Sequence, residues 1–150
     1  MEMPDIRSLV PHAGPMVLLD RVISVDHDSL CAEVTIRDGG LFCSPDGVGA
    51  WVGIEYMAQA IAAHAGHAAR LRGEPVKIGF LLGSRRYECT RPLFAVGSVL
   101  RVHIARLLLA ENGLGSFDCR IEDEDGVAAT ATVSVFLPAN VDEFLNGSME

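Results

Sequence analysis

The sequence contains no uninterrupted apolar run long enough to cross a membrane, because its most apolar stretch, residues 51–69, is broken by polar and charged side chains. The interruptions are Glu55, Gln59, His64 and His67. Residues 1–5 contain no basic region followed by an apolar core, so we expect no secretory signal peptide in this chain. The four cysteines have neither close pairing nor metal-type spacing, which predicts reduced thiols in a cytoplasmic protein.

Lysine is nearly absent, since Lys77 is the only one, and acidic residues outnumber basic ones to give a net charge of −8. A charge of this sign disfavours nonspecific binding to nucleic acid. Three arginines, Arg85, Arg86 and Arg91, nevertheless lie close together in the sequence. They form either a local basic patch on an acidic protein or separate solvated positions on a strand.

Metal-binding and cofactor motifs are also lacking. The five histidines include no His-Glu-x-x-His pattern. His64 and His67 are spaced to share one face of a helix, but neither a cysteine nor a carboxylate joins them at a useful spacing. We therefore expect no metal and no cofactor.

Hydrophobic residues, by contrast, are abundant. They make up 49% of the 150 residues, and the mean hydropathy is +0.28. A chain of this length favours one domain, spanning 1–150, with a substantial core. The excess of apolar residues predicts further burial between subunits, as in a dimer.

The order of the predicted elements is two strands, one long helix and then four strands. The pattern indicates strands at 16–25 and 30–37, a helix at about 48–71, and extended segments at 76–89, 99–109, 114–122 and 127–137. A helix that is apolar nearly all round must be covered by a sheet over most of its surface. The chain is therefore predicted to be an α+β protein with the hotdog architecture, a curved antiparallel sheet around a central helix.

Glu55 is the most unusual residue of the predicted helix, because it lies within an otherwise apolar segment. Carboxylates are almost never fully buried unless they are paired or used. An ionised carboxylate there costs several kcal/mol unless it has a partner or keeps a proton. A carboxylate in such a place indicates a proton donor or acceptor in catalysis, and a purely structural Glu is the alternative.

Two segments of the chain resemble a known enzyme family. The stretch Leu9-Val10-Pro11-His12, continuing to Leu18-Leu19-Asp20-Arg21-Val22, resembles the opening of the FabA/FabZ-type 3-hydroxyacyl-[acyl-carrier-protein] dehydratases. The stretch Glu55-Tyr56-Met57-Ala58-Gln59 resembles their helix signature. When residues 78–89 are considered with these two segments, the chain is most similar to the predicted dehydratases of aryl polyene pigment clusters.

This resemblance implies the hotdog fold and the removal of water from a 3-hydroxyacyl thioester, carried by acyl carrier protein or CoA, to give a 2-enoyl thioester. It implies the catalytic carboxylate role for Glu55 and places the backbone N–H groups of Gly49 and Ala50 near the substrate's thioester oxygen. It also implies a homodimer, or a heterodimer with another hotdog subunit. The family's catalytic histidine, within Gly-His-Phe-Pro, has no counterpart in the stretch Leu41-Phe42-Cys43-Ser44-Pro45.

Helix geometry limits which other histidine could replace the family's missing histidine as the base. Each residue of a helix turns by about 100°, which puts His64 on the face opposite Glu55 and His67 roughly 18 Å further along the axis. His12 remains, as a catalytic residue or a structural loop residue. Gln59 follows Glu55 by four residues and can orient its carboxylate near the substrate. Cys43 is an alternative candidate, as a nucleophile.

Three functions follow from these residues. The first is a dehydratase acting on carrier-linked acyl chains. The second is a catalytically silent acyl-binding subunit of a heteromeric dehydratase. The third is a hotdog acyl thioesterase, in which Glu55 would activate water or attack the thioester. The fold alone does not distinguish among them.

Overall fold

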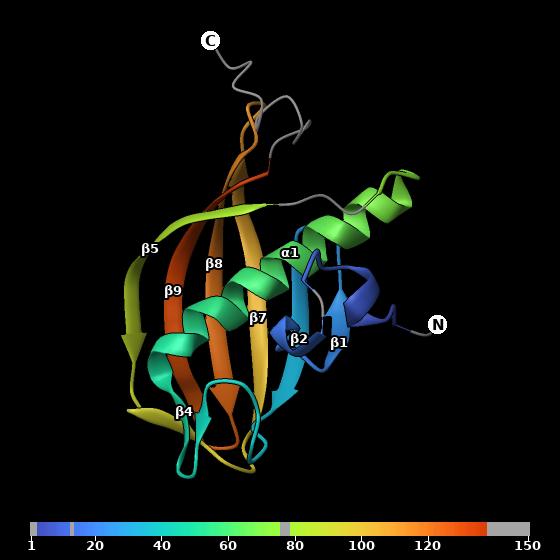
Figure 1. Ribbon diagram of the computed structural model, residues 1–150. Coiled ribbons are helices and arrows are strands. Elements are labelled where there is room, and N and C mark those ends of the chain that lie inside the picture. Colours follow the sequence, from blue (N-terminus) through green and yellow to red (C-terminus); the bar gives the residue numbers. More distant parts are fainter. Residues whose placement is uncertain (1–2, 13, 76–78, 138–150) are drawn as a thin grey trace.

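The computed structural model describes residues 3–12, 14–75 and 79–137, and these form an antiparallel sheet curved around one helix (Figure 1). The sheet has six strands in the order β1-β2-β7-β8-β9-β5. Their bounds are β1 Arg21–Val25, β2 Ser29–Thr35, β7 Val99–Leu109, β8 Leu114–Asp123, β9 Gly126–Phe136 and β5 Phe80–Cys89. The α+β hotdog prediction is confirmed.

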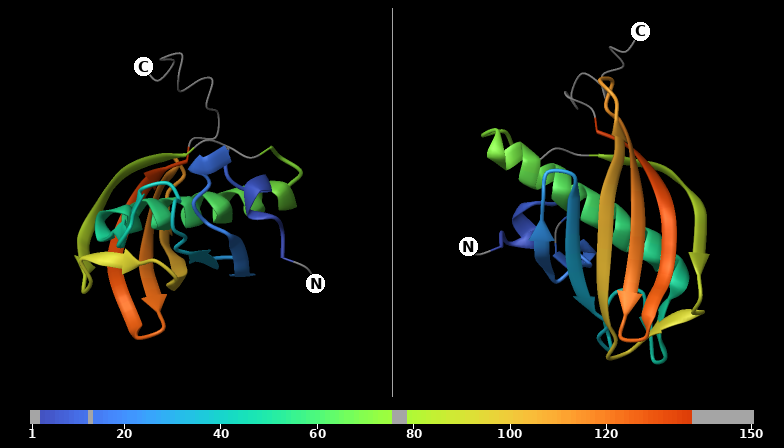
Figure 2. Two further views of the ribbon diagram at one scale, coloured as in Figure 1. Left: turned by 60° about the horizontal axis from the view of Figure 1, so that its bottom comes forward. Right: turned by 180° about the vertical axis from the view of Figure 1, so that it is seen from behind.

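Helix α1, Gly53–Leu71, crosses the concave face of the sheet (Figure 2). Its buried side chains include Met57, Ala60 and Ile61, which pack against inward-facing residues of the strands such as Val102 and Val133. The described residues pack around this one core. The assignment of the whole chain, 1–150, to one domain stays a prediction.

The helix begins later than the predicted residue 48. Residues Gly47–Gly49 form strand β4 of a small second sheet, in the order β3-β4-β6, with β3 at Cys43–Ser44 and β6 at Leu93–Ala95. A 3₁₀ turn, Ala50–Val52, then leads into α1. The prediction was wrong here because the backbone of 47–50 pairs with a strand that follows far later in the sequence.

The first strand is also shorter than predicted. Residues 16–20 were expected to extend it, but β1 begins only at Arg21, and Gly14–Met16 is a short 3₁₀ helix. The N-terminal segment runs across α1 instead of joining the sheet (Figure 1). The backbone at Met16 and Leu18 is hydrogen-bonded by a helix side chain, Gln59, which keeps these residues off the sheet.

The predicted hairpins are present. Residues 26–28 join β1 to β2, 110–113 join β7 to β8, and 124–125 join β8 to β9. Residues 76–78, which belong to the predicted extended segment 76–89, lie outside the described residues. In the part of the chain that the structure describes, no helix has the length and hydropathy that a membrane span requires.

Candidate active site

Glu55 lies in the first turn of α1. A carboxylate is electrostatically favourable there, because the helix dipole places partial positive charge at the helix N-terminus. Its side chain is 35% exposed, so the carboxylate is only partly buried although its helix is largely apolar. The sheet covers the opposite faces of the helix, whereas Glu55 and the nearby Ala58 and Ala62 face a cavity.

His12 is the histidine that approaches this carboxylate. Its Nε2 lies 3.7 Å from Oε1 of Glu55. Its Nδ1 is buried and has no hydrogen-bond partner among the described residues. A buried ring nitrogen without a partner is costly unless something else binds there. The ring therefore presents Nε2 to the carboxylate, while Nδ1 is enclosed by the protein.

The segment that carries His12 is attached to the helix on both sides. On the N-terminal side, Leu9 lies directly on Gly66, where a Cβ atom would collide with the Leu9 carbonyl. Arg70 also donates a hydrogen bond to the Ser8 hydroxyl at 2.8 Å. Glycine in the middle of a helix weakens it, and at Gly66 it allows this close approach. The sequence signal that could have revealed the contact is this mid-helix glycine.

On the C-terminal side, Gln59 makes the attachment. Its Oε1 accepts from the Leu18 N–H at 2.9 Å, and its Nε2 donates to the Met16 carbonyl at 2.6 Å. The same Nε2 lies 3.3 Å from Oε1 of Glu55. Gln59 thus orients the carboxylate, as its four-residue spacing predicts. Its side chain is fully buried and its polar atoms are engaged within the protein, which fits positioning better than direct substrate binding.

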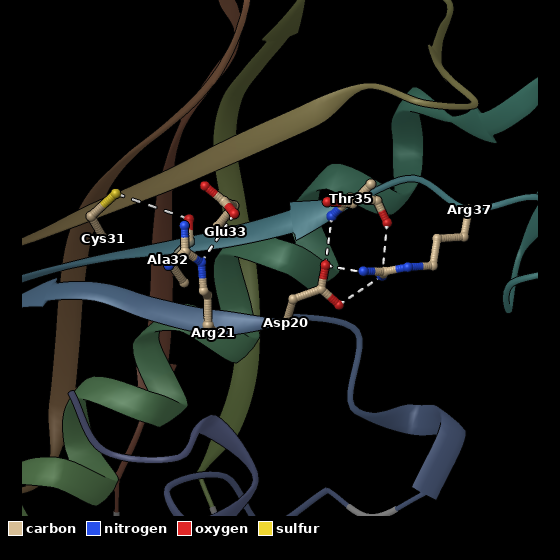
Figure 3. A network of polar contacts seen from close by, with 7 residues as sticks. All are labelled: Asp20, Arg21, Cys31, Ala32, Glu33, Thr35 and Arg37. Carbon is tan, nitrogen blue, oxygen red and sulfur yellow. Dashed lines mark hydrogen bonds and ion pairs between the residues drawn. The ribbon is translucent and has the colours of Figure 1, made fainter. Parts of the chain in front are cut away.

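A further polar network holds the chain where it leaves the helix surface and enters the sheet (Figure 3). The carboxylate of Asp20 accepts from the Thr35 N–H at 2.7 Å and from Arg37 at 3.0 Å. Beside it, Arg21 donates to Glu33 at 3.1 Å. In the sequence, Asp20 and Arg21 stand out only as part of the resemblance to the dehydratase family. The structure gives them a physical role, which is to fix β1 against β2.

The cavity next to the pair has a volume of about 150 Å³. Its polar side chains are His12 and Glu55, and its remaining walls are mostly apolar, with Ile61, Leu81 and Val135 among them. A largely apolar pocket with a few convergent polar groups is the usual form of a small-molecule site. Here those polar groups are a carboxyl group and an imidazole, which are the side chains that serve as acid and base in catalysis.

Gly49 and Ala50 lie just before the helix, but not at its N-terminus as expected. Gly49 is the last residue of β4 and is paired with Leu93. The N–H of Ala50 donates to the Pro92 carbonyl at 3.2 Å, so it is not free for an oxyanion. The Ala50 carbonyl accepts a hydrogen bond from the Tyr87 hydroxyl.

The other candidate residues have local partners. His64 is buried and its Nε2 lies 2.9 Å from the His27 carbonyl, away from Glu55. His103 pairs with Glu122 on the sheet at 2.6 Å. The Cys43 thiol donates to the Ser44 carbonyl at 3.2 Å. Among the described residues, no group of three or more histidine, cysteine or acidic side chains is arranged to hold a metal.

The fold and this site define a hotdog protein with a histidine–carboxylate pair at an apolar cavity. A family model described as ApeP-like, ApeP dehydratase, matches residues 4–146. The chain belongs to this family, and it is a dehydratase-like protein.

Individual relatives agree with this assignment. The chain is similar to a chain in the structure of the dehydratase heterocomplex ApeI:P from Xenorhabdus doucetiae, with 32% identity, a TM-score of 0.89, and coverage of 99% of this chain and 100% of that one. It is 24% identical to the 3-hydroxyacyl-[acyl-carrier-protein] dehydratase FabZ of Bartonella quintana (strain Toulouse) over 144 residues, which is 91% of this chain and 90% of FabZ.

A more distant structure shares the fold alone. This is a hypothetical thioesterase from Streptococcus pneumoniae TIGR4 with coenzyme A, at 12% identity and a TM-score of 0.60 over 78% of this chain and 84% of that one. The dehydratase matches favour the first of the predicted functions over the thioesterase alternative.

Proposed function

We propose that the chain takes part in removing water from a 3-hydroxyacyl thioester carried by acyl carrier protein, giving the 2-enoyl thioester. The observation that carries this proposal is the contact of His12 with Glu55 at the edge of an apolar cavity. The reaction needs a base for the α-proton and an acid for the departing hydroxyl group, and it needs both close to one substrate.

In the proposed mechanism, His12 takes the proton from C2 of the acyl chain. The electron pair of that C–H bond forms the C2–C3 double bond, and the C3–O bond breaks as Glu55 protonates the hydroxyl to release water. The pair is left as an imidazolium and a carboxylate. Transfer of one proton from His12 back to Glu55, across the 3.7 Å contact, restores the starting state.

The thioester oxygen gains negative charge during this step and needs hydrogen-bond donors. The N–H of Gly49 remains a proposal for this role. The N–H of Ala50 would first have to leave the Pro92 carbonyl. The acyl chain would lie along the apolar walls formed by Ile61 and Val135.

Association with a second hotdog subunit is the second part of the proposal. Strand β5 is the last strand of the sheet and pairs only with β9 among the described residues. Leu41, Phe42 and Trp51 are exposed, the last by 67%. Leu41 and Phe42 belong to the stretch that corresponds to the family's histidine loop, and the Phe42 ring contacts Trp51. The similarity to a protein of a dehydratase heterocomplex supports association with such a partner. If the partner, and not His12, supplies the base, this chain is the silent acyl-binding subunit.

The four cysteines are all free, which supports the proposal that the chain acts in the cytoplasm, where thiols stay reduced.

The test is an assay of the pure protein with a 3-hydroxyacyl carrier protein, following the absorbance of the conjugated enoyl thioester. Glu55→Gln and His12→Ala should each lower the rate by about 10²–10⁴-fold, the usual contribution of a positioned acid or base. His27→Ala is the matched control, because His27 lies in an exposed hairpin turn, and its rate should be unchanged.

The other outcomes are equally informative. Loss in Glu55→Gln alone would remove His12 from the mechanism. Release of a free thiol without an enoyl product would indicate a thioesterase. If the wild-type protein is inactive alone but raises the rate of an active hotdog dehydratase subunit, this chain is the silent subunit.

A further inference from the structure

His12 lies in a loop between two short 3₁₀ helices, Ile6–Ser8 and Gly14–Met16. The side chains of Val10 before it and Val17 after it are buried in the core. Among the described residues, neither Val10 nor His12 makes a hydrogen bond from backbone to backbone. The shape of the loop at His12 therefore depends on side-chain contacts.

Arg7 connects the two sides of this loop. Its Nη1 donates a hydrogen bond to the Gly14 carbonyl at 3.1 Å. In the part of the chain that the structure describes, no other hydrogen bond joins the segment before His12 to the segment after it. The same Gly14 carbonyl also accepts from the Val17 N–H at 3.2 Å, which connects the arginine to the 3₁₀ helix that follows.

Local structure fixes the backbone at both ends of this hydrogen bond. The Arg7 N–H donates to the Asp5 carboxylate at 3.1 Å, and Asp5 is the N-cap of the first 3₁₀ helix. Gly14 has a φ of +58°, a left-handed conformation that glycine adopts at little cost. The donor and the acceptor are therefore both held in place, and the bond closes the loop over residues 7–14.

The position of His12 matters because its contact with Glu55 is long. The distance from Nε2 to Oε1 is 3.7 Å, whereas groups that exchange a proton lie within about 2.6–3.2 Å of each other. A misplacement of about 1 Å can lower an enzymatic rate by about 10²-fold. The contacts of Ser8 and Leu9 with α1 hold only the N-terminal side of the loop. Arg7 extends this hold to the far side of His12.

We propose that Arg7 is a positioning residue, which affects the reaction only through the place that it gives to His12. This inference rests on the proposed function, since it takes His12 to be the base. Arg7 is exposed and does not line the cavity beside Glu55. It therefore contributes nothing to acyl binding and little to the stability of the fold.

The first test is the rate of Arg7→Gln in the enoyl absorbance assay, with the partner subunit present if the wild-type protein requires one. The kcat should fall by about tenfold to a hundredfold, while KM stays within about twofold because the cavity walls are unchanged. The urea midpoint should not move, since the substitution is at the surface. Arg7→Lys should recover most of the rate, because the Gly14 carbonyl needs only one N–H donor.

The matched control is Arg120→Gln. Arg120 is also exposed and makes a comparable contact, 3.2 Å from its Nη2 to Oε1 of Glu122, but it lies on strand β8 away from the loop. Its rate should equal that of the wild-type protein. The ring signals of His12 in NMR spectra should shift in Arg7→Gln and stay in place in Arg120→Gln, which gives a measurement independent of turnover.

A double-mutant cycle separates positioning from a general structural effect. If Arg7 acts only through His12, then Arg7→Gln should cause no further loss of rate in the His12→Ala background. A general effect on the fold would lower the rate by the same factor in both backgrounds.

The inference is overturned if Arg7→Gln keeps the wild-type kcat and His12 signals, if Arg7→Lys is as slow as Arg7→Gln, or if the loss is the same with and without His12. In each case His12→Ala alone would still be slow, so the proposed function would stand. If His12→Ala keeps the wild-type rate, the proposed base is wrong, and the inference fails with it.

Discussion

Replacing Gln59 by leucine tests the attachment that places His12 beside Glu55. The substitution keeps similar bulk but removes the hydrogen bonds to the Leu18 N–H and the Met16 carbonyl. A buried polar group left without a partner costs about 1–3 kcal/mol. With two such groups, both part-buried, the free energy of unfolding should fall by about 2–6 kcal/mol. Domains usually have a free energy of unfolding of about 5–15 kcal/mol. If the wild-type value lies in the upper part of this range, the variant stays folded.

The loss of stability should be accompanied by a loss of activity, because the segment that carries His12 is released on one side. The free energy of unfolding would be measured in urea by circular dichroism, since Trp51, the single tryptophan, is 67% exposed and reports poorly on the core. The rate would be measured with the enoyl absorbance assay under conditions in which the variant is fully folded.

The matched control is Leu30→Ala, a truncation in the core of β2 away from the cavity beside Glu55. Leu30 is 2% exposed, and such truncations cost about 2–5 kcal/mol. The control should lose comparable stability and keep the wild-type rate. The reasoning is refuted if Gln59→Leu loses no more activity than Leu30→Ala, or if it unfolds at the wild-type urea concentration.

Three other outcomes are expected. Arg85 and Arg86 are exposed and have no ion pair among the described residues, so Arg85→Glu combined with Arg86→Glu should weaken binding of an acidic carrier protein by about tenfold at low salt; unchanged affinity by calorimetry would contradict a docking role. Burial lowers the pKa of His64 below its ordinary value of 6.5 despite hydrogen bonds that act in the opposite direction. As the pH is lowered, His64 therefore takes up a proton in the unfolded chain before it does so in the folded one. The free energy of unfolding should be highest above pH 6.5 and decrease below it; an equally steep decrease in His64→Leu would contradict this. A Cβ atom at Gly53 would collide with the Tyr87 hydroxyl, so Gly53→Ala should cost about 1–3 kcal/mol of unfolding free energy and be partly rescued by Tyr87→Phe; strictly additive effects would show that the two do not interact.

The amino-acid sequence determined the fold class through local patterns. The sequence predicts several strands and one helix that is apolar nearly all round but too interrupted to cross a membrane. Such a helix must be covered by a sheet, and the structure confirms this. The spacing of Glu55 and Gln59 also determined that these two side chains share one face, because helix geometry depends on sequence separation alone. The same geometry excluded His64 and His67 as partners of Glu55.

Contacts between distant residues were decided only by the tertiary structure. The start of α1 moved from the predicted residue 48 to Gly53 because β4 pairs with β6, which follows far later in the chain. The half-exposure of Glu55 depends on which helix face the sheet leaves uncovered. Local periodicity contains no information on either of these.

The placement of His12 shows the same division most clearly. In the sequence, His12 is the histidine that remains once helix geometry excludes His64 and His67, and its role there is open between catalysis and structure. Its approach to Glu55 depends on the contact of Leu9 with Gly66 and on the hydrogen bonds of Gln59. Each of these joins residues more than 40 positions apart, so only the folded chain brings the histidine to the carboxylate.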